Sequence, residues 1–142
     1  MEPKVIEYKH KVQYYETDKM GITHHSNYIR WMEEARVNYL HEIGCDYEKL
    51  EERGIISPVT RVDVKYKKTT TFPEEVTIRV SAEPFNGLRL VVNYEMINDS
   101  GKQVCTATSE HCFLGEGGRI VRMKKECPDY TKMLEAVTGV AE

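Results

Sequence analysis

The residues of this chain whose types and spacing could do chemistry lie within residues 15–36. Asp18 is followed by a glycine turn at Gly21, and His24 and His25 come just before the expected start of a helix. A helix N-terminus offers unpaired backbone N–H groups and a partial positive charge, which suit an anion or a developing oxyanion. If a substrate carbonyl lies against the N–H groups near His25, the carboxylate of Asp18 could attack the carbonyl carbon or activate a water molecule.

Asp18 and the histidines also have plainer interpretations. From spacing alone, a turn or capping role is favoured for Asp18. His24 and His25 are adjacent, so their side chains point in different directions, and no Asp or Glu at ligand spacing completes a metal site. The sequence therefore predicts no metal and no cofactor. His10 and His111 fall on expected strand faces, where a hydrogen-bonded structural histidine is the usual outcome.

The composition limits the class of protein. With 142 residues, 40% of them hydrophobic and 30% charged, the chain has the size and balance of one globular domain spanning residues 1–142. A net charge of -3 argues against broad nucleic-acid binding. No apolar run is long enough to cross a membrane, and the first residues lack a signal-peptide core, so we expect a cytoplasmic protein.

The four cysteines are widely scattered along the chain. They form no Cys-x-x-Cys pair and have no flanking base pattern, which argues against a zinc knuckle, a redox motif and a cysteine nucleophile. We expect buried or idle free thiols at Cys45, Cys105, Cys112 and Cys127.

Two elements must position the candidate residues. Residues 5–15 alternate between apolar and polar side chains, which predicts a half-buried strand before the loop. Ser26 and Asn27 are both good N-caps, and apolar residues follow them at helical spacing until Gly44, a natural stop. A long helix is therefore expected over residues 27–43.

The rest of the chain predicts a sheet. Several further runs alternate with period two, and Asn86 followed by Gly87 is a strong hairpin signal. This order indicates an α+β domain whose antiparallel sheet wraps one long helix, with edges that pairing between subunits could protect. After the long helix we expect a short helix over residues 46–53, strands over 62–66, 76–82, 88–96 and 103–114, a short edge strand over 119–123, and a helix over 128–137.

The basic residues of the strands allow two interpretations. Arg61, Lys65 and Lys67 alternate with apolar residues, so they fit the solvated side of one strand. In the functional interpretation, some of them, with Lys68 and Arg89, meet the phosphates of a nucleotide-bearing ligand at a subunit edge.

The candidate segment resembles the signature of hotdog-fold acyl-CoA thioesterases of the 4-hydroxybenzoyl-CoA thioesterase type. The spacing Asp-x-x-Gly-x-x-x-His-x-x-Tyr carries most of this resemblance, which extends through nearly the whole chain. The matching residues are Tyr15, Glu16, Thr17, Asp18, Gly21, His25, Asn27, Tyr28, Glu34, Ala35 and Arg36.

The resemblance implies a five- or six-stranded sheet around the helix, homodimers joined edge to edge, often homotetramers, and active sites at the dimer interface. It also implies hydrolysis of an acyl-CoA thioester, with Asp18 as nucleophile or general base and the backbone N–H of His25 as the group that polarises the carbonyl. The neighbouring residues expected to bind substrate are Gly21, His24, Asn27 and Tyr28, with Lys65, Lys67 and Arg89 as candidates for the CoA phosphates.

Two departures from the family pattern affect the expected substrate. Family members specialised for the hydroxybenzoyl group carry an aromatic residue at the position of His25. In having His25, this chain more closely resembles the branch that acts on short or medium aliphatic acyl-CoAs. The basic cluster that contacts the CoA nucleotide in the hydroxybenzoyl enzyme is replaced here by residues 84–89.

Two rival functions fit the same resemblance. A hotdog hydratase or dehydratase would carry an Asp-x-Asn-Pro-x-His pattern or a close relative of it, which this sequence does not contain. A non-catalytic acyl-CoA binding module remains an alternative, because a fold can hold a ligand without cleaving it.

Overall fold

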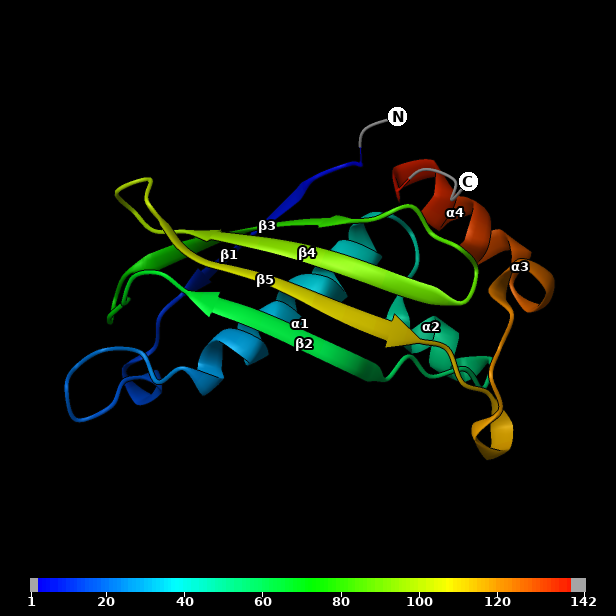
Figure 1. Cartoon of the computed structure of the whole chain (residues 1–142), viewed down its shortest axis with the longest axis horizontal. Coiled ribbons are helices and arrows are strands. Elements are labelled where there is room, and N and C mark those ends of the chain that lie inside the picture. The colour runs from blue at the N-terminus through cyan, green and yellow to red at the C-terminus, as the bar shows by residue number, and fades with distance from the viewer. Residues whose placement is uncertain (1–2, 139–142) are drawn as a thin grey trace.

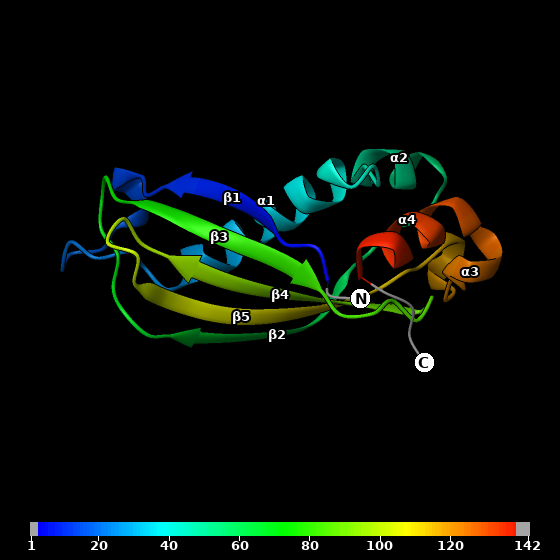
Figure 2. The same ribbon diagram turned by 90° about the horizontal axis from the view of Figure 1, so that it is seen from above.

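A five-stranded antiparallel sheet and one long helix form the framework of the protein. The computed structural model describes residues 3–138. The strands lie in the order β1-β3-β4-β5-β2, and Figures 1 and 2 show helix α1 running along one face of the sheet. The predicted α+β hotdog architecture is confirmed. The strands are β1 (Ile6–Lys11), β2 (Val59–Tyr66), β3 (Glu75–Ala82), β4 (Arg89–Ile97) and β5 (Gln103–Cys112), and the helices are α1 (Ser26–Glu42), α2 (Tyr47–Glu52), α3 (Met123–Glu126) and α4 (Pro128–Thr138), with short 3-10 turns at Tyr14–Glu16 and Glu116–Gly118.

Helix α1 follows the predicted apolar stripe. Tyr28, Met32, Ala35 and Tyr39 are all buried against the sheet, because residues three and four apart fall on one face of a helix. The start of the helix differs from the expectation, since α1 begins at Ser26 and neither predicted cap acts as one. The N-cap position belongs to His25, whose side chain forms no capping hydrogen bond.

The inner face of the sheet supplies the other half of the core. In β3, β4 and β5 every second residue is buried, as period-two alternation requires. The alternation predicted for the strand over 103–114 is confirmed, because five alternate residues of this segment are buried: Cys105, Ala107, Ser109, His111 and Phe113. The four cysteines are free thiols, as predicted.

Two predicted strands are wrong in extent or type. The first strand ends at Lys11, and a 3-10 turn over Tyr14–Glu16 follows it, because Glu16 folds back into the core. The expected edge strand over 119–123 does not form. Ile120 makes one isolated bridge to Leu114, and the chain then enters α3.

The edge strand β2 is more exposed than its apolar alternation suggests. Among residues 3–138 it pairs only with β5, and seven of its eight residues are exposed, including Val59, Val62 and Tyr66. A long exposed edge with free backbone groups is a place where another strand can pair.

The two ends of the sheet carry different structures. The loop over residues 12–25 lies at one end, and α3 and α4 lie at the other (Figure 1). Helix α4 is held there by Lys4 N–H, which donates to Val137 O at 2.8 Å. Within residues 3–138, no helix is both long and apolar enough to span a membrane.

Candidate active site

Asp18 sits at the tip of a small hairpin. Thr17 and Thr23 form an isolated antiparallel bridge, and the Asp18 N–H donates to Ile22 O at 2.9 Å. Gly21 has φ +77°, which explains the glycine, and its N–H donates to Asp18 O at 2.9 Å. The loop is therefore a defined turn.

The carboxylate of Asp18 makes the turn interaction that its spacing predicts and keeps one oxygen free. Its Oδ1 accepts a 2.8 Å hydrogen bond from the Met20 N–H, which is a turn interaction. Its Oδ2 has no hydrogen-bond partner among residues 3–138, and the residue is only partly buried. One oxygen thus fixes the side chain while the other stays available to a reactant.

The loop is tied to the chain that follows β2. Thr23 N–H donates to Thr70 O at 2.9 Å, and the two threonine hydroxyls lie 2.6 Å apart. The Thr71 hydroxyl donates to Gly21 O at 2.7 Å, and the Tyr28 hydroxyl lies 3.0 Å from Thr70 Oγ1. These bonds fix the position of the Asp18 loop relative to the first turn of α1.

The start of α1 presents an unpaired backbone donor. His24 N–H donates to Glu16 O at 2.8 Å, and the Asn27 side chain donates to the same oxygen at 3.0 Å. The N–H of His25 has no partner in the described part of the chain. Tyr66 donates from its hydroxyl to His25 O at 3.1 Å. The helix N-terminus at His25 can therefore polarise an oxygen placed against it.

The two imidazoles do not converge on a common centre. Their rings stack with centroids 4.4 Å apart, and His24 Nδ1 lies 2.8 Å from Ser26 Oγ. Among the described residues, no group of three or more His, Cys, Asp or Glu side chains could hold a metal ion.

The buried carboxylate of Glu16 stabilises the segment that leads into the Asp18 loop. Glu16 accepts hydrogen bonds from Trp31 Nε1 at 2.7 Å and from the Gln13 N–H at 2.8 Å. His10 places Nε2 2.9 Å from Glu16 and Nδ1 3.0 Å from Glu34, so it is the hydrogen-bonded histidine that its strand position predicted. Burial acts to raise the pKa of Glu16, but the bonds from His10, Gln13 and Trp31 outweigh it and lower that pKa.

The predicted basic residues lie away from this loop. Lys65 flanks Tyr66 in β2 and therefore points to the opposite face of the sheet. Lys67 follows the strand, and its Nζ donates to Gln103 Oε1 at 2.8 Å. Arg89 pairs with Glu110 at 3.0 Å near the other end of the sheet. Hydrogen bonds thus tie Gly21, His24 and Asn27 to the segment that carries Asp18, and Tyr28 to Thr70, which holds that segment, with His25 at its end. Within one chain, Lys65 and Arg89 lie elsewhere.

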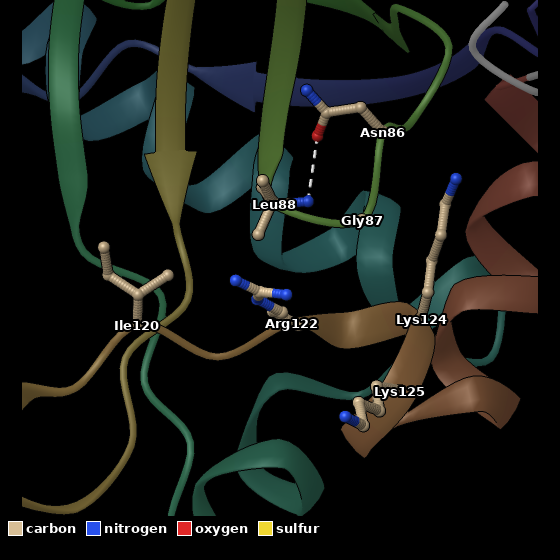
Figure 3. A pocket seen from close by; sticks show the side chains of 7 residues that line it. All are labelled: Asn86, Gly87, Leu88, Ile120, Arg122, Lys124 and Lys125. Atoms are coloured by element: carbon tan, nitrogen blue, oxygen red, sulfur yellow. Dashed lines mark hydrogen bonds between the residues drawn. The ribbon is translucent and has the colours of Figure 1, made fainter.

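A basic pocket lies at that other end, beside α3 (Figure 3). It has a volume of about 580 Å³. Asn86 Oδ1 accepts from the N–H groups of Leu88 and Arg89, which confirms the turn predicted at Asn86 and Gly87. The pocket is lined by this turn and by Ile120, Arg122, Lys124 and Lys125, so it does not adjoin the Asp18 loop.

Sequence reasoning missed the interior polar residues. Arg36 was predicted only as part of the family pattern, and Tyr94 and Ser109 only fall within the strands predicted over 88–96 and 103–114. The structure buries all three beside His111. Burial, with a smaller contribution from the Arg36 charge, lowers the pKa of His111 to about 3. Burial likewise raises the pKa of Tyr94 to about 12. A strand-face alternation gives no signal for such a cluster, because the partners come from separate elements.

Known proteins are similar to this chain in sequence and fold. A family model described as the thioesterase-like superfamily matches residues 12–136. A protein of Bacillus subtilis (strain 168) named "Putative acyl-CoA thioesterase YneP" is 35% identical over 121 residues, which cover 84% of this chain and 88% of that protein.

Solved structures agree with the family match. The DHNA-CoA thioesterase from Staphylococcus aureus has a TM-score of 0.90 and 34% identity, covering 94% of this chain and 90% of that one. The 4-hydroxybenzoyl CoA thioesterase from Pseudomonas sp. strain CBS-3 has a TM-score of 0.80, 21% identity and coverage of 91% and 98%, and so shares the fold. The predicted resemblance to hotdog thioesterases is confirmed, and the chain belongs to the thioesterase-like superfamily.

Proposed function

We propose that this protein hydrolyses an acyl-CoA thioester, with Asp18 as nucleophile or general base and the His25 N–H as oxyanion donor. The observation that carries the proposal is a free carboxylate oxygen on Asp18 and a free helix N-terminal N–H on His25, both close to the Thr17–Thr23 bridge that closes one hairpin. Two similar proteins, YneP and the S. aureus enzyme, are named as CoA thioesterases, which supports this reaction class.

The chemistry follows from the two groups. The His25 N–H and the positive end of α1 stabilise the negative charge that develops on the thioester oxygen. Asp18 Oδ2 either attacks the carbonyl carbon, so that the C–S bond breaks and water then hydrolyses the anhydride, or takes a proton from an attacking water. In both routes one water is consumed, and a free acid and CoA thiol are released.

The surrounding residues shape this site. Gly21 allows the tight turn that presents Asp18, and Asn27 and Tyr28 fix the loop to α1. His24 lies beside the donor and is positioned to contact substrate. For Lys65, Lys67 and Arg89 we retain the prediction that they meet CoA phosphates at a subunit edge.

The exposed edge strand β2 favours a homodimer. A homotetramer made of two such dimers is compatible with the same edge. Val59 and Val62 on β2 and Ile29 on α1 are exposed apolar side chains around one cavity, and Tyr66 is exposed farther along β2. A second copy pairing along β2 would cover this surface and complete the backbone ladder. Light scattering coupled to size-exclusion chromatography tests this, and Val62→Lys is expected to shift the protein toward monomer. A wild-type protein that is monomeric at micromolar concentration would contradict the dimer.

A thiol-release assay over a panel of acyl-CoAs tests the activity. Asp18→Asn is expected to lower turnover by several orders of magnitude, because asparagine keeps the size but cannot act as nucleophile or base. Asp99→Asn, an exposed turn aspartate, serves as the matched control. Undiminished turnover of Asp18→Asn would contradict the catalytic role proposed for Asp18. Conversion of enoyl-CoA without thiol release would instead identify a hydratase.

A further inference from the structure

Asn27 connects the two arms of the candidate site through one side-chain amide. Its Nδ2 donates to Glu16 O at 3.0 Å and to His24 O at 3.2 Å, and the residue is only 8% exposed. Both acceptors are carbonyl oxygens, so the nitrogen end of the amide must face them. Glu16 lies two residues before Asp18 in the chain, and His24 directly precedes the oxyanion donor. The amide therefore ties the carboxylate arm to the donor arm.

The carbonyl of His24 and the N–H of His25 belong to the same peptide group. This carbonyl accepts the backbone N–H of Asn27 at 3.0 Å in addition to the side-chain amide, so two donors meet one oxygen. Hydrogen bonds polarise one another in a chain, so donors on the carbonyl strengthen the N–H of the same peptide as a donor. Because a peptide group is planar, fixing the carbonyl also fixes the direction of the N–H.

The other contacts of this segment reach neighbouring peptide groups. Tyr66 donates its hydroxyl to His25 O at 3.1 Å, and that carbonyl belongs to the peptide group of Ser26. The Ser26 N–H donates to His24 Nδ1 at 3.3 Å. Asn27 is thus the residue whose side chain acts on the peptide group that carries the His25 N–H.

We infer that Asn27 is a positioning residue for the oxyanion donor: its amide directs and strengthens the His25 N–H and sets the distance between that N–H and the Asp18 carboxylate. The inference rests on the proposed thioesterase function and deepens it. The charge on the thioester oxygen is largest in the transition state, so a weaker or misdirected donor lowers kcat more than it changes KM.

Asn27→Ala removes the amide without leaving either acceptor unpaired. Glu16 O keeps the His24 N–H, and His24 O keeps the backbone N–H of residue 27. Alanine is also a good helix former, so the variant is expected to fold. Its kcat is expected to fall by about tenfold to a hundredfold while KM stays within about twofold of the wild-type value, as measured by thiol release.

Two further variants frame this result. Asn27→Ser is expected to fall between the wild type and Asn27→Ala, because its one hydroxyl proton can serve the His24 carbonyl three residues back. Asn98→Ala is the control. It removes a side chain whose Oδ1 accepts the N–H groups of Ser100 and Lys102 within its own hairpin turn, and it is expected to leave kcat unchanged.

The stretching frequency of a bound carbonyl measures the donor without turnover. The probe is a ketone analogue of octanoyl-CoA in which a methylene group replaces the thioester sulfur and the carbonyl carbon is isotopically labelled. In infrared difference spectra the wild type is expected to lower this frequency relative to the analogue in an aprotic solvent, and Asn27→Ala to reduce that shift. Tyr66→Phe is expected to keep the wild-type shift, because it removes a donor from the next peptide group.

The infrared result separates the two proposals. An equal shift in the wild type and in folded Asn27→Ala overturns the positioning role and leaves the oxyanion donor in place. A wild type that does not lower the frequency overturns both, since the His25 N–H then does not contact the carbonyl. An Asn27→Ala variant that changes KM alone also overturns the positioning role. Because the ketone is not hydrolysed, the shift stays informative even if Asp18→Asn proves fully active.

Discussion

Trp31 Nε1 donates a 2.7 Å hydrogen bond to Oε2 of the buried Glu16 and thereby joins the second turn of α1 to the segment that leads into the Asp18 loop. The backbone oxygen of the same glutamate accepts from His24 N–H and from the Asn27 side chain. One residue thus holds both arms of the candidate site, although its side chain points into the core.

Glu16→Gln is expected to lower the free energy of unfolding by about 1–3 kcal/mol at pH 7, because a neutral amide cannot accept from all three donors around it. The pKa of Glu16 is lowered in the folded state. Its contribution to the free energy of unfolding is therefore fully present above the unfolded-state pKa of about 4.3 and is lost as the pH falls through the folded-state pKa. Urea unfolding at pH 7 and pH 4 measures both effects. Equal stability of variant and wild type at pH 7 would contradict this role.

His111 is expected to make the protein sensitive to moderate acid. Its folded-state pKa of about 3 lies below the unfolded value of about 6.5, so between these values the unfolded chain binds the extra proton. Stability therefore rises with pH over this window, with a contribution of up to about 1.4 kcal/mol per pH unit. In His111→Gln the stability profile between pH 4.5 and 6.5 is expected to be flatter by roughly this amount, as followed by urea unfolding. A profile parallel to that of the wild type would rule the effect out.

Gly21→Ala separates backbone strain from function. Gly21 and Gly54 have φ of +77° and +79°, and neither has an atom within 4 Å of an added Cβ. Both alanine variants are expected to lose about 1–2 kcal/mol of stability, since an L-residue resists this conformation. Only Gly21→Ala should also reduce thiol release, because Gly21 shapes the turn that presents Asp18. Equal turnover in the two variants would show that the turn geometry does not matter to the reaction.

Thr70→Val is expected to loosen the candidate site. The Thr70 hydroxyl is buried and lies 2.6 Å from Thr23 Oγ1 and 3.0 Å from the Tyr28 hydroxyl. Valine leaves the Tyr28 hydroxyl without this partner and leaves Thr23 Oγ1 only its 3.2 Å bond to Thr70 O, which costs about 1–3 kcal/mol. Hydrogen exchange should become faster at the Thr23 amide, while the exposed Thr69→Val serves as the control. Unchanged exchange at Thr23 would mean that the backbone bond to Thr70 O suffices.

The local pattern of the sequence determined the long helix, the period-two strands and the turns. The apolar stripe from Tyr28 to Tyr39 specifies which face of α1 is buried, and Gly21 and Gly87 mark turns that need positive φ. The family pattern around Asp18 also identified the fold correctly. These features follow from residues close in sequence, so a single chain reveals them without its tertiary structure.

Only the tertiary structure decided which polar residues become buried and what they meet. Glu16, Arg36 and His111 stand in polar or alternating contexts, and nothing nearby in the sequence indicates that they enter the core. The exposure of β2 and the isolated bridge at Ile120 in place of the strand expected over 119–123 likewise depend on elements distant along the chain. Burial and hydrogen bonding are properties of the assembled sheet and helix, because the desolvating neighbours and the partners come from separate strands and turns.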